Sequence, residues 1–392
     1  MRFGGGFVTT SDIDRLPPPI LNEPETETRM IRKLLHTAAM IVGVTIAAAS
    51  AAAQTAPQIA FDSVPDPLHL PSGLYFGEVS GVAVNSQGHI FAFSRGNTTG
   101  PAYGAAAAQL LEFAPDGQFI REIGHNLYAW SFAHAVKVDA EDNIWVTDKG
   151  SDQVVKFDHD GRVAMVFGRK QEASDEDTEP LKHPRPPLPP IDGMFRQVTD
   201  IAWDSAGNGY ISDGYINSRV ARVSRDGEWL GSWGSPGSAP GQMITPHSIA
   251  IDAEDHVYVA DRGNRRIQVF DTQGNLLRQI TIDVPYDTNA KPAIGNRPSL
   301  PFPAGTPQTM APGSPWTVCI TPPPHQVLYA SDAYPGRIYK LNLDGTVLGV
   351  LGTSGKQLKQ FGWIHEIACP SENTLFVAEL LNWRVQKLIL HP

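Results

Sequence analysis

Three histidines stand at the start of similar segments of the sequence. His134, His247 and His365 open the segments HAVKVDAEDNIWVTD, HSIAIDAEDHVYVAD and HEIACPSENTLFVAE. Three imidazole nitrogens that converge on one point are the donor set of a catalytic zinc ion, because they leave a coordination position open for substrate or water. Taken singly, each histidine is more simply a polar residue at the rim of a fold. The metal site therefore depends on whether the fold brings the three side chains together.

The three segments belong to a repeat that occurs six times. Each copy has an apolar strand, a turn, a second strand rich in β-branched and aromatic residues, a loop and two further strands. Asp-Gly pairs at 116, 160, 226 and 344 predict tight hairpins between the third and fourth strands. The pattern predicts an all-β fold, a six-bladed β-propeller, and it resembles propellers of the NHL-repeat class.

The sixth copy reaches Pro392 before its fourth strand, while QIAFDSV at 58–64 is a lone strand-like segment ahead of the first copy. We expect this N-terminal strand to complete the last blade and close the ring, which removes exposed sheet edges. Residues 55–392 are therefore predicted to form one catalytic propeller domain.

The histidines share one position in the aligned copies, near the entrance of the innermost strand, in blades two, four and six. The residues at this position are Ser80, His134, Thr199, His247, Trp316 and His365. Because alternate blades lie about 120° apart around the channel, the three imidazoles should converge on its axis.

Further polar side chains follow the second strand, in loops on the same rim as the histidines, because the strands of a blade alternate in direction. These side chains are Arg95, Tyr215 and Arg262. Two arginines suit a substrate carboxylate, and nearby positive charge would lower the pKa of Tyr215 and fit it for general-base work. The alternatives are surface ion pairs for the arginines and a half-buried rim aromatic for the tyrosine.

The residue that ends the second strand is acidic in five of the six copies. The six residues are Ser94, Asp148, Asp213, Asp261, Asp332 and Glu379. Because the acidic residues recur in blades without a histidine, we expect them to brace neighbouring loops.

With these residues the chain resembles the peptidyl-α-hydroxyglycine α-amidating lyase family, the lyase half of the enzyme that makes C-terminal peptide amides. The resemblance runs from about Ser80 to Glu379 and includes VSGVAVNSQGHIFAFSRG, ISDGYINSR, TPHSIAIDAEDHVYVADRGNRRIQ and IHEIA. It implies a carbon–nitrogen lyase that cleaves an N-acyl- or peptidyl-α-hydroxyglycine to an amide and glyoxylate. It also implies zinc on the three histidines, Tyr215 as the base, and Arg95 and Arg262 on the substrate carboxylate.

The same resemblance implies a structural calcium ion. The family holds this ion with an Asp after the third histidine and with main-chain carbonyls that match Val82 and Val136. In this sequence the acidic residue is Glu366. The family's disulfides have no counterpart here.

The formal net charge of -10 and the absence of basic runs argue against nucleic acid and anionic membranes as partners. We expect a small-molecule or peptide substrate with a C-terminal α-hydroxyglycine-like group.

Residues 30–53 have the pattern of a secretory signal peptide, with Arg32 and Lys33 before an apolar stretch that ends in small residues. Residues 1–29 are predicted to be a non-native or disordered extension, with Met30 as the start. We therefore expect a secreted or periplasmic protein with no membrane association after signal cleavage. The alternative is a signal anchor with a short cytosolic tail.

Two cysteines, Cys319 and Cys369, fall in apolar strands of successive repeats. They align one residue out of register, which points them to opposite faces of their strands. We expect two buried free thiols, although the compartment would permit a disulfide.

Two insertions, 169–195 and 283–313, lead into a first strand and should lie on the histidine rim, either as a lid or specificity wall or as disordered decoration. Two alternatives to a lyase stay open. The first is another metal-dependent hydrolase or lactonase, although calcium lactonases use carboxylate and Asn ligands. The second is a non-catalytic NHL-repeat binding protein, which would not need arginines and a tyrosine beside the histidines.

Overall fold

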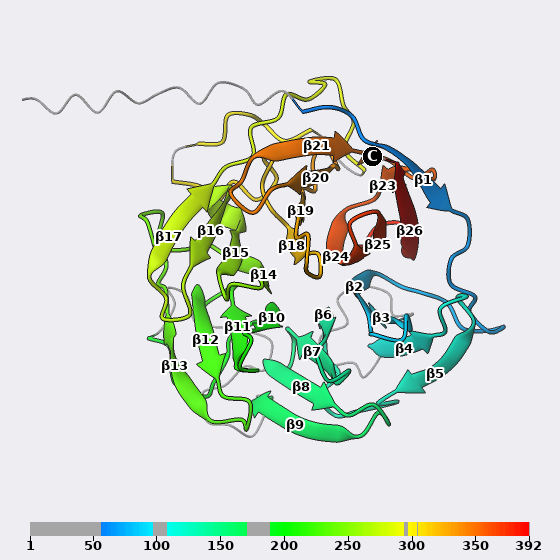
Figure 1. Cartoon of the computed structure of the whole chain (residues 1–392), viewed down its shortest axis with the longest axis vertical. Coiled ribbons are helices and arrows are strands. Elements are labelled where there is room, and N and C mark those ends of the chain that lie inside the picture. Colours follow the sequence, from blue (N-terminus) through cyan, green and yellow to red (C-terminus); the bar gives the residue numbers. More distant parts are fainter. Residues whose placement is uncertain (1–55, 97–107, 171–188, 294–296, 304, 392) are drawn as a thin grey trace, which may run out of the picture. The chain divides into compact units, whose positions relative to one another are not determined.

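The structure is a computed structural model, and it describes residues 56–96, 108–170, 189–293, 297–303 and 305–391. In this part of the chain, six four-stranded sheets surround a central channel (Figure 1). The prediction of an all-β, six-bladed propeller is therefore confirmed. Residues 1–29 and the predicted signal peptide 30–53 lie outside the described residues.

In each blade the first strand lines the channel and the fourth lies at the periphery (Figure 1). Blade 1 contains β2 (Val79–Val84), β3 (Ile90–Ser94), β4 (Gln109–Phe113) and β5 (Phe119–Ile123). Blade 2 contains β6 (Ala133–Val138), β7 (Ile144–Asp148), β8 (Gln153–Phe157) and β9 (Val163–Gly168). Blade 3 contains β10 (Asp200–Trp203), β11 (Gly209–Asp213), β12 (Arg219–Val223) and β13 (Trp229–Trp233).

Blade 4 contains β14 (Pro246–Ile251), β15 (Val257–Asp261), β16 (Arg266–Phe270) and β17 (Leu276–Ile280). Blade 5 contains β18 (Thr317–Ile320), β19 (Leu328–Ser331), β20 (Ile338–Leu341) and β21 (Val347–Leu351). Blade 6 contains β24 (Ile364–Ser371), β25 (Thr374–Glu379), β26 (Arg384–His391) and the N-terminal β1 (Ala60–Val64). A parallel pair, β22 (Thr353–Ser354) and β23 (Gln360–Phe361), lies outside the blades.

The N-terminal strand closes the ring as predicted. β1 pairs antiparallel with β26, from Ala60 opposite His391 to Val64 opposite Lys387. The Ser63 hydroxyl donates a hydrogen bond of 2.6 Å to Oε1 of Gln386 within this pair. The outer edge of blade 6 is therefore covered by a strand from the other end of the propeller sequence.

The apolar core is divided into six clusters, one at each junction between neighbouring blades. At the junction of the last and first blades, Val79 and Val82 pack with Phe376 and Ala378. Strand faces that would be apolar surfaces in an isolated blade are thus buried against the next blade, and this burial stabilises the closed ring.

The predicted hairpins between third and fourth strands are present. The glycine of each Asp-Gly pair has a positive φ, for example 87° at Gly117 and 99° at Gly345. Residues other than glycine rarely adopt this backbone conformation, so the Asp-Gly pairs fix the positions of the turns.

The acidic residues that end the second strands brace loops, as expected. Asp148 accepts main-chain N–H groups of Ser131 and Phe132 at 2.9 Å each. Glu379 accepts the N–H of Gly362 at 2.6 Å. Each carboxylate therefore ties the loop that follows its own strand to the segment that leads into the first strand of the same blade.

The prediction of two free thiols is wrong: Cys319 and Cys369 form a disulfide, with their Cα atoms 6.1 Å apart. They lie in β18 and β24, the inner strands of neighbouring blades. In a ring of blades, each sheet packs one of its faces against the opposite face of the next sheet. Cysteines on opposite faces of successive blades are therefore the ones that meet.

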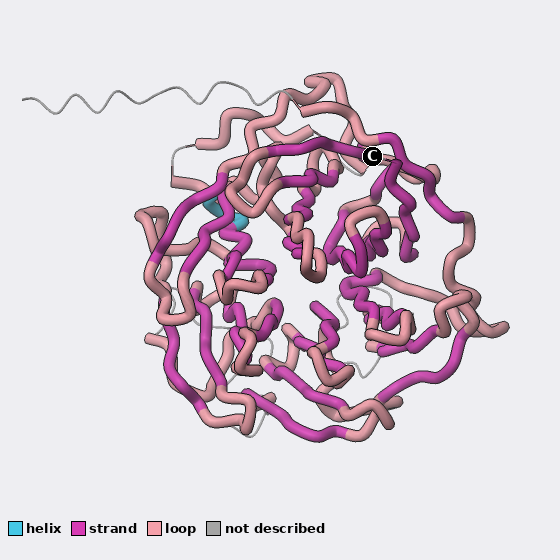
Figure 2. Tube along the Cα trace, viewed as in Figure 1, coloured by secondary structure: helices cyan, strands magenta, loops and turns pink. Residues whose placement is uncertain are grey.

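Strands and loops make up the described part of the chain, apart from one short 3-10 helix, η1 (Arg262–Asn264) (Figure 2). Within these residues we find no helix with the length and apolar character needed to cross a membrane.

Candidate active site

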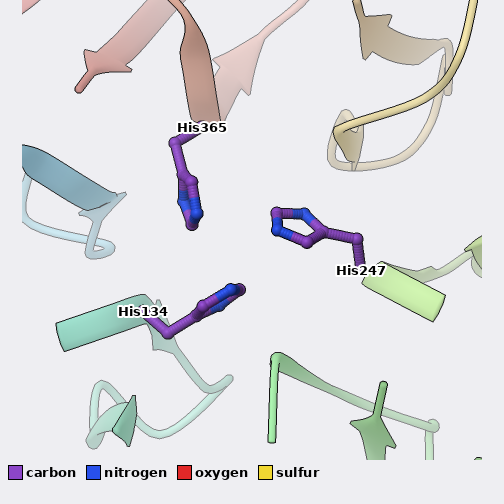
Figure 3. Close-up of side chains that lie close together, drawn as sticks. All are labelled: His134, His247 and His365. Carbon is purple, nitrogen blue, oxygen red and sulfur yellow. The ribbon is translucent and has the colours of Figure 1, made fainter. Parts of the chain in front are cut away.

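Three inner strands bring the predicted histidines together at one end of the channel. His134, His247 and His365 lie near the starts of β6, β14 and β24. Their ligand-capable nitrogens lie within 4.8 Å of one another, and all three side chains are buried. Figure 3 shows the three rings pointing toward a common centre.

Main-chain oxygens orient the three rings. Nδ1 of His134 lies 2.6 Å from the main-chain oxygen of Thr199, and Nδ1 of His247 lies 2.6 Å from that of Trp316. Nδ1 of His365 lies 2.7 Å from the main-chain oxygen of Ser80. A carbonyl can only accept, so each Nδ1 carries the proton and each Nε2 keeps a free lone pair. The three oxygens belong to the aligned position in blades three, five and one. The residues at one aligned position of the six blades thus supply both the histidines and the main-chain carbonyl groups that orient them.

Burial lowers the pKa of all three histidines well below the usual range. Neighbouring positive charge adds to this effect, from Arg262 at His247 and from Arg95 at His365. The rings are therefore neutral near pH 7, which is the form that binds a metal ion. Three neutral, oriented imidazoles fit a divalent transition ion such as zinc.

Tyr215 lies against the histidines, in the loop after β11. Its hydroxyl is 3.2 Å from Nε2 of His247 and 3.4 Å from Nε2 of His134. Burial alone would raise the pKa of Tyr215, but the positive charges of Arg262, Lys149 and Arg95 outweigh it and lower that pKa. The hydroxyl is thus held at the imidazole centre in a positive environment.

Arg262 opens η1 and is buried beside the same centre. Its guanidinium carbon lies 4.0 Å from the ring centroid of Trp316 and 5.3 Å from that of Tyr215. Nε and Nη1 of Arg262 make no hydrogen bond to any residue that the structure describes. Buried polar groups are nearly always paired, so these donors suit an anionic group that enters the site.

Arg95 lies on the same rim but is already engaged. Its Nε donates to the main-chain oxygen of Ala133 at 3.1 Å, and Nη1 pairs with Glu78. The guanidinium carbon also lies 3.9 Å from the ring centroid of Phe132. Arg95 therefore contributes positive charge next to His134 with part of its donor set in use.

A third cation, Lys149, was not predicted from the sequence. Its Nζ lies 3.9 Å from the ring centroid of Tyr215 and 5.2 Å from that of Phe132. The repeat did hold a signal, because Lys149 occupies the position directly after the second strand that Arg95 and Arg262 occupy in their blades.

Two tryptophans near His247 and Arg262 were also not predicted as site residues. Trp316 occupies the aligned position of the histidines in blade five, and its ring lies 5.0 Å from that of His247. Trp363 packs edge-to-face on Trp316 with the ring centroids 5.0 Å apart. The two indoles therefore form an aromatic wall beside His247 and Arg262.

Comparisons with known proteins find matches to the NHL repeat and to amidating enzymes. A family model for the NHL repeat matches residues 244–270. The rat peptidylglycine alpha-amidating monooxygenase is 31% identical over 225 residues, which cover 51% of this chain and 21% of the rat protein. A Caenorhabditis elegans protein named as a probable peptidyl-alpha-hydroxyglycine alpha-amidating lyase is 28% identical over 211 residues, covering 50% of this chain and 55% of that protein. The chain is a relative of the amidating lyases.

This relationship covers part of each protein. The chain spans about a fifth to a third of the length of the first curated relatives it matches. A gluconolactonase structure from Xanthomonas campestris has a TM-score of 0.52 at 14% identity, covering 86% of this chain and 99% of that one. That likeness shows the propeller fold alone.

Beside the three-histidine centre, the described part of the insertion 283–313 packs on the loop that carries Arg262. The N–H of Gln308 donates to the oxygen of Gly263 at 2.7 Å, and the Trp316 indole donates to the oxygen of Thr309 at 2.9 Å. This insertion therefore lies on the histidine rim, as predicted. Residues 171–188 of the other insertion lie outside the described residues.

The residues around Glu366 do not fit the calcium ion that the amidating-lyase resemblance implies. Oε2 of Glu366 accepts the main-chain N–H groups of Val82 and Val136 at 3.0 and 3.2 Å. Its Oε1 lies 2.8 Å from the ammonium of Lys137. Burial alone would lower the pKa of Lys137, but Asp200 and Glu366 outweigh it and raise that pKa, so the ammonium stays charged. A second cation at this carboxylate would be repelled.

Proposed function

We propose that this chain is a zinc-dependent carbon–nitrogen lyase that cleaves an N-acyl- or peptidyl-α-hydroxyglycine into an amide and glyoxylate. One observation carries the proposal: a tyrosine hydroxyl touches two of three buried, converging imidazoles beside an arginine with unfilled donors. The relatives named as amidating lyases support a lyase enzyme. Peptide amidation would be one use of this reaction.

The three histidines would hold the metal through Nε2, because each Nδ1 is directed at a main-chain oxygen. Three nitrogen ligands leave a position for substrate, as in catalytic rather than structural zinc sites. A bound zinc ion would supply Lewis-acid chemistry that makes a substrate hydroxyl more acidic.

Tyr215 is suited to remove the proton of that hydroxyl. Its oxygen lies within hydrogen-bond distance of His247 Nε2, so it reaches the centre where the hydroxyl would bind. The surrounding positive charge favours the phenolate form, which is the form that accepts a proton.

Arg262 is suited to bind the substrate carboxylate. A buried guanidinium makes charge-assisted hydrogen bonds to a carboxylate, and Nε and Nη1 are open for such bonds. Lys149 and Arg95 would strengthen this preference, since both raise the positive charge at Tyr215. The carboxylate would then orient the adjacent carbon toward the tyrosine.

The reaction needs no oxidant, reductant or water. The hydroxyl proton passes to Tyr215, and the electron pair left on that oxygen forms the carbonyl of glyoxylate. The carbon–nitrogen bond breaks with its electron pair moving to the nitrogen. That nitrogen takes a proton back from Tyr215 and becomes the amide.

We further propose that the protein works outside the cytoplasm, in the secreted or periplasmic space. The pattern at residues 30–53 motivates this proposal. The disulfide between Cys319 and Cys369 supports it, because disulfides persist in oxidising compartments.

The test combines metal analysis of the purified protein with glyoxylate release from α-hydroxyhippurate. The wild type is expected to hold one zinc ion per chain and to release glyoxylate. His247→Ala should lose metal affinity by at least about 100-fold and lose activity with it. His256→Ala is a matched control, because His256 pairs with Asp252 away from the centre and should leave both readouts unchanged.

A wild type that holds no zinc and releases no glyoxylate contradicts the proposal. Hydrolysis of a lactone panel by the metal-loaded protein, without glyoxylate release, would instead favour the lactonase alternative.

A further inference from the structure

A charged layer crosses the channel below the histidines. It consists of Lys137 on β6, Asp200 on β10 and Glu366 on β24, which belong to blades two, three and six. Nζ of Lys137 lies 2.8 Å from Oε1 of Glu366 and 3.5 Å from Oδ2 of Asp200. The side chains of both carboxylates are at most 3% exposed. One ammonium thus bridges two buried carboxylates that come from different blades.

Both carboxylates also accept hydrogen bonds from other inner strands. Glu366 takes N–H groups from blades one and two, at Val82 and Val136. Asp200 Oδ2 accepts the Ser248 hydroxyl at 2.8 Å and the N–H of Ile249 at 3.1 Å, both from blade four. The layer therefore joins five of the six blades, and its negative charge is met by one ammonium and by several donors.

Blade five is joined to the layer through a serine. The N–H of Val318 donates to the Ser248 hydroxyl oxygen at 3.2 Å, and that hydroxyl donates onward to Asp200. All six inner strands are thus connected to one network. A network of this kind holds a ring together only while its buried carboxylates have partners, since an unpaired buried carboxylate is costly.

The donors in this layer differ from those that a calcium ion requires. Calcium takes six to eight oxygen ligands and has no use for N–H groups or an ammonium. Here N–H groups are directed at the carboxylate oxygens, and the Lys137 ammonium stands next to both carboxylates. The position between the two carboxylates already has a cation.

We propose that the ammonium of Lys137 is the resident cation of the channel, and that it takes the role of a structural calcium ion in joining the blades. The propeller then folds and stays stable without calcium. The chain carries this cation covalently, so its stability is independent of the calcium concentration outside the cell. This inference does not depend on the proposed lyase activity.

The experiment measures calcium content and thermal unfolding on the zinc-loaded mature protein in calcium-free buffer and with millimolar calcium chloride. The wild type should contain no stoichiometric calcium, and its unfolding midpoint should be the same in both buffers. Lys137→Met keeps the length of the side chain and removes its charge. Its midpoint should fall by about 5 °C or more without calcium, because two buried carboxylates lose their partner. Added calcium should not restore that midpoint, because N–H groups still face the carboxylate oxygens.

Lys340→Met is the matched control, because Lys340 is similarly buried and pairs with Glu372 at 2.6 Å away from the channel. It should lose less stability and gain no response to calcium. Lys137→Arg keeps the charge and should stay insensitive to calcium, which decides the question if the Met variant does not fold. Stoichiometric calcium in the wild type, a wild-type midpoint that rises with calcium, or a Lys137→Met protein as stable as the wild type would each overturn the proposal.

Discussion

Nδ1 of His365 in the last blade lies 2.7 Å from the main-chain oxygen of Ser80 in the first blade. The third imidazole is therefore oriented across the junction where the ring closes. The same junction buries the apolar cluster of Val79, Val82 and Phe376. The junction that closes the propeller therefore also orients one histidine of the three-histidine centre.

The first prediction concerns the tautomers of the three histidines. In metal-free protein near pH 7.5, all three rings should carry their proton on Nδ1, because each Nδ1 faces a carbonyl oxygen. Nitrogen NMR of isotopically labelled protein distinguishes the two tautomers. His159 is exposed and serves as the internal reference. Protons on Nε2 in the three buried rings would contradict the hydrogen bonds from Nδ1 to the main-chain oxygens.

The second prediction separates chemistry from metal binding at Tyr215. Tyr215→Phe removes only the hydroxyl, which touches His134 and His247 without being needed to orient them. The turnover number should fall by about 10²–10⁴-fold with zinc content unchanged, as expected when a general base is lost. Steady-state kinetics and metal analysis on the same sample measure both effects.

Tyr334→Phe is the control for this variant. Tyr334 is buried, packs on the ring of Tyr286 and donates a hydrogen bond to the oxygen of Ala290 on the insertion. Loss of zinc from Tyr215→Phe would show that the tyrosine has a structural role. Full activity would show that another group takes the proton.

The third prediction ranks the three cations of the rim. Arg262→Gln should lower kcat/KM by about 10–100-fold, because a charge-assisted pair contributes roughly 1.5–3 kcal/mol. Lys149→Met should lower kcat/KM by about 10-fold or less, because the positive charge of Lys149 acts on the pKa of Tyr215. Arg95→Gln should lie between them, since Arg95 is already paired with Glu78. An activity loss at Lys149 larger than that at Arg262 would reverse the assignment of the carboxylate site.

Much of this site could be predicted from the sequence because it follows from the repeat. The blade count and the shared position of the histidines fix their convergence without knowledge of any side-chain contact. Lys149 could have been found by the same alignment, since it matches Arg95 and Arg262 in position.

Other features could not be found in this way. The oxygens that orient the histidines belong to the main chain, so residue types carry no signal for them. The role of Lys137 depends on which charged side chains of three separate blades meet in the channel. The repeat alignment does not reveal the disulfide, because Cys319 and Cys369 lie on opposite faces of their strands and meet only where successive blades pack together.

The last prediction concerns that disulfide. Cys319 and Cys369 join blades five and six and close a loop with a sequence separation of 50 residues. Replacing both with serine should lower the free energy of unfolding by about 2–4 kcal/mol, mainly because the unfolded chain gains conformational freedom. Cys369 lies four residues beyond His365 on β24, about 13 Å along the strand, so zinc content and turnover should be unchanged. Chemical unfolding with and without a reductant measures the effect. The wild type should weaken under reduction to the level of the double variant, and the double variant should not respond. A wild type whose unfolding is insensitive to reduction would contradict the role of this bond in joining the two blades.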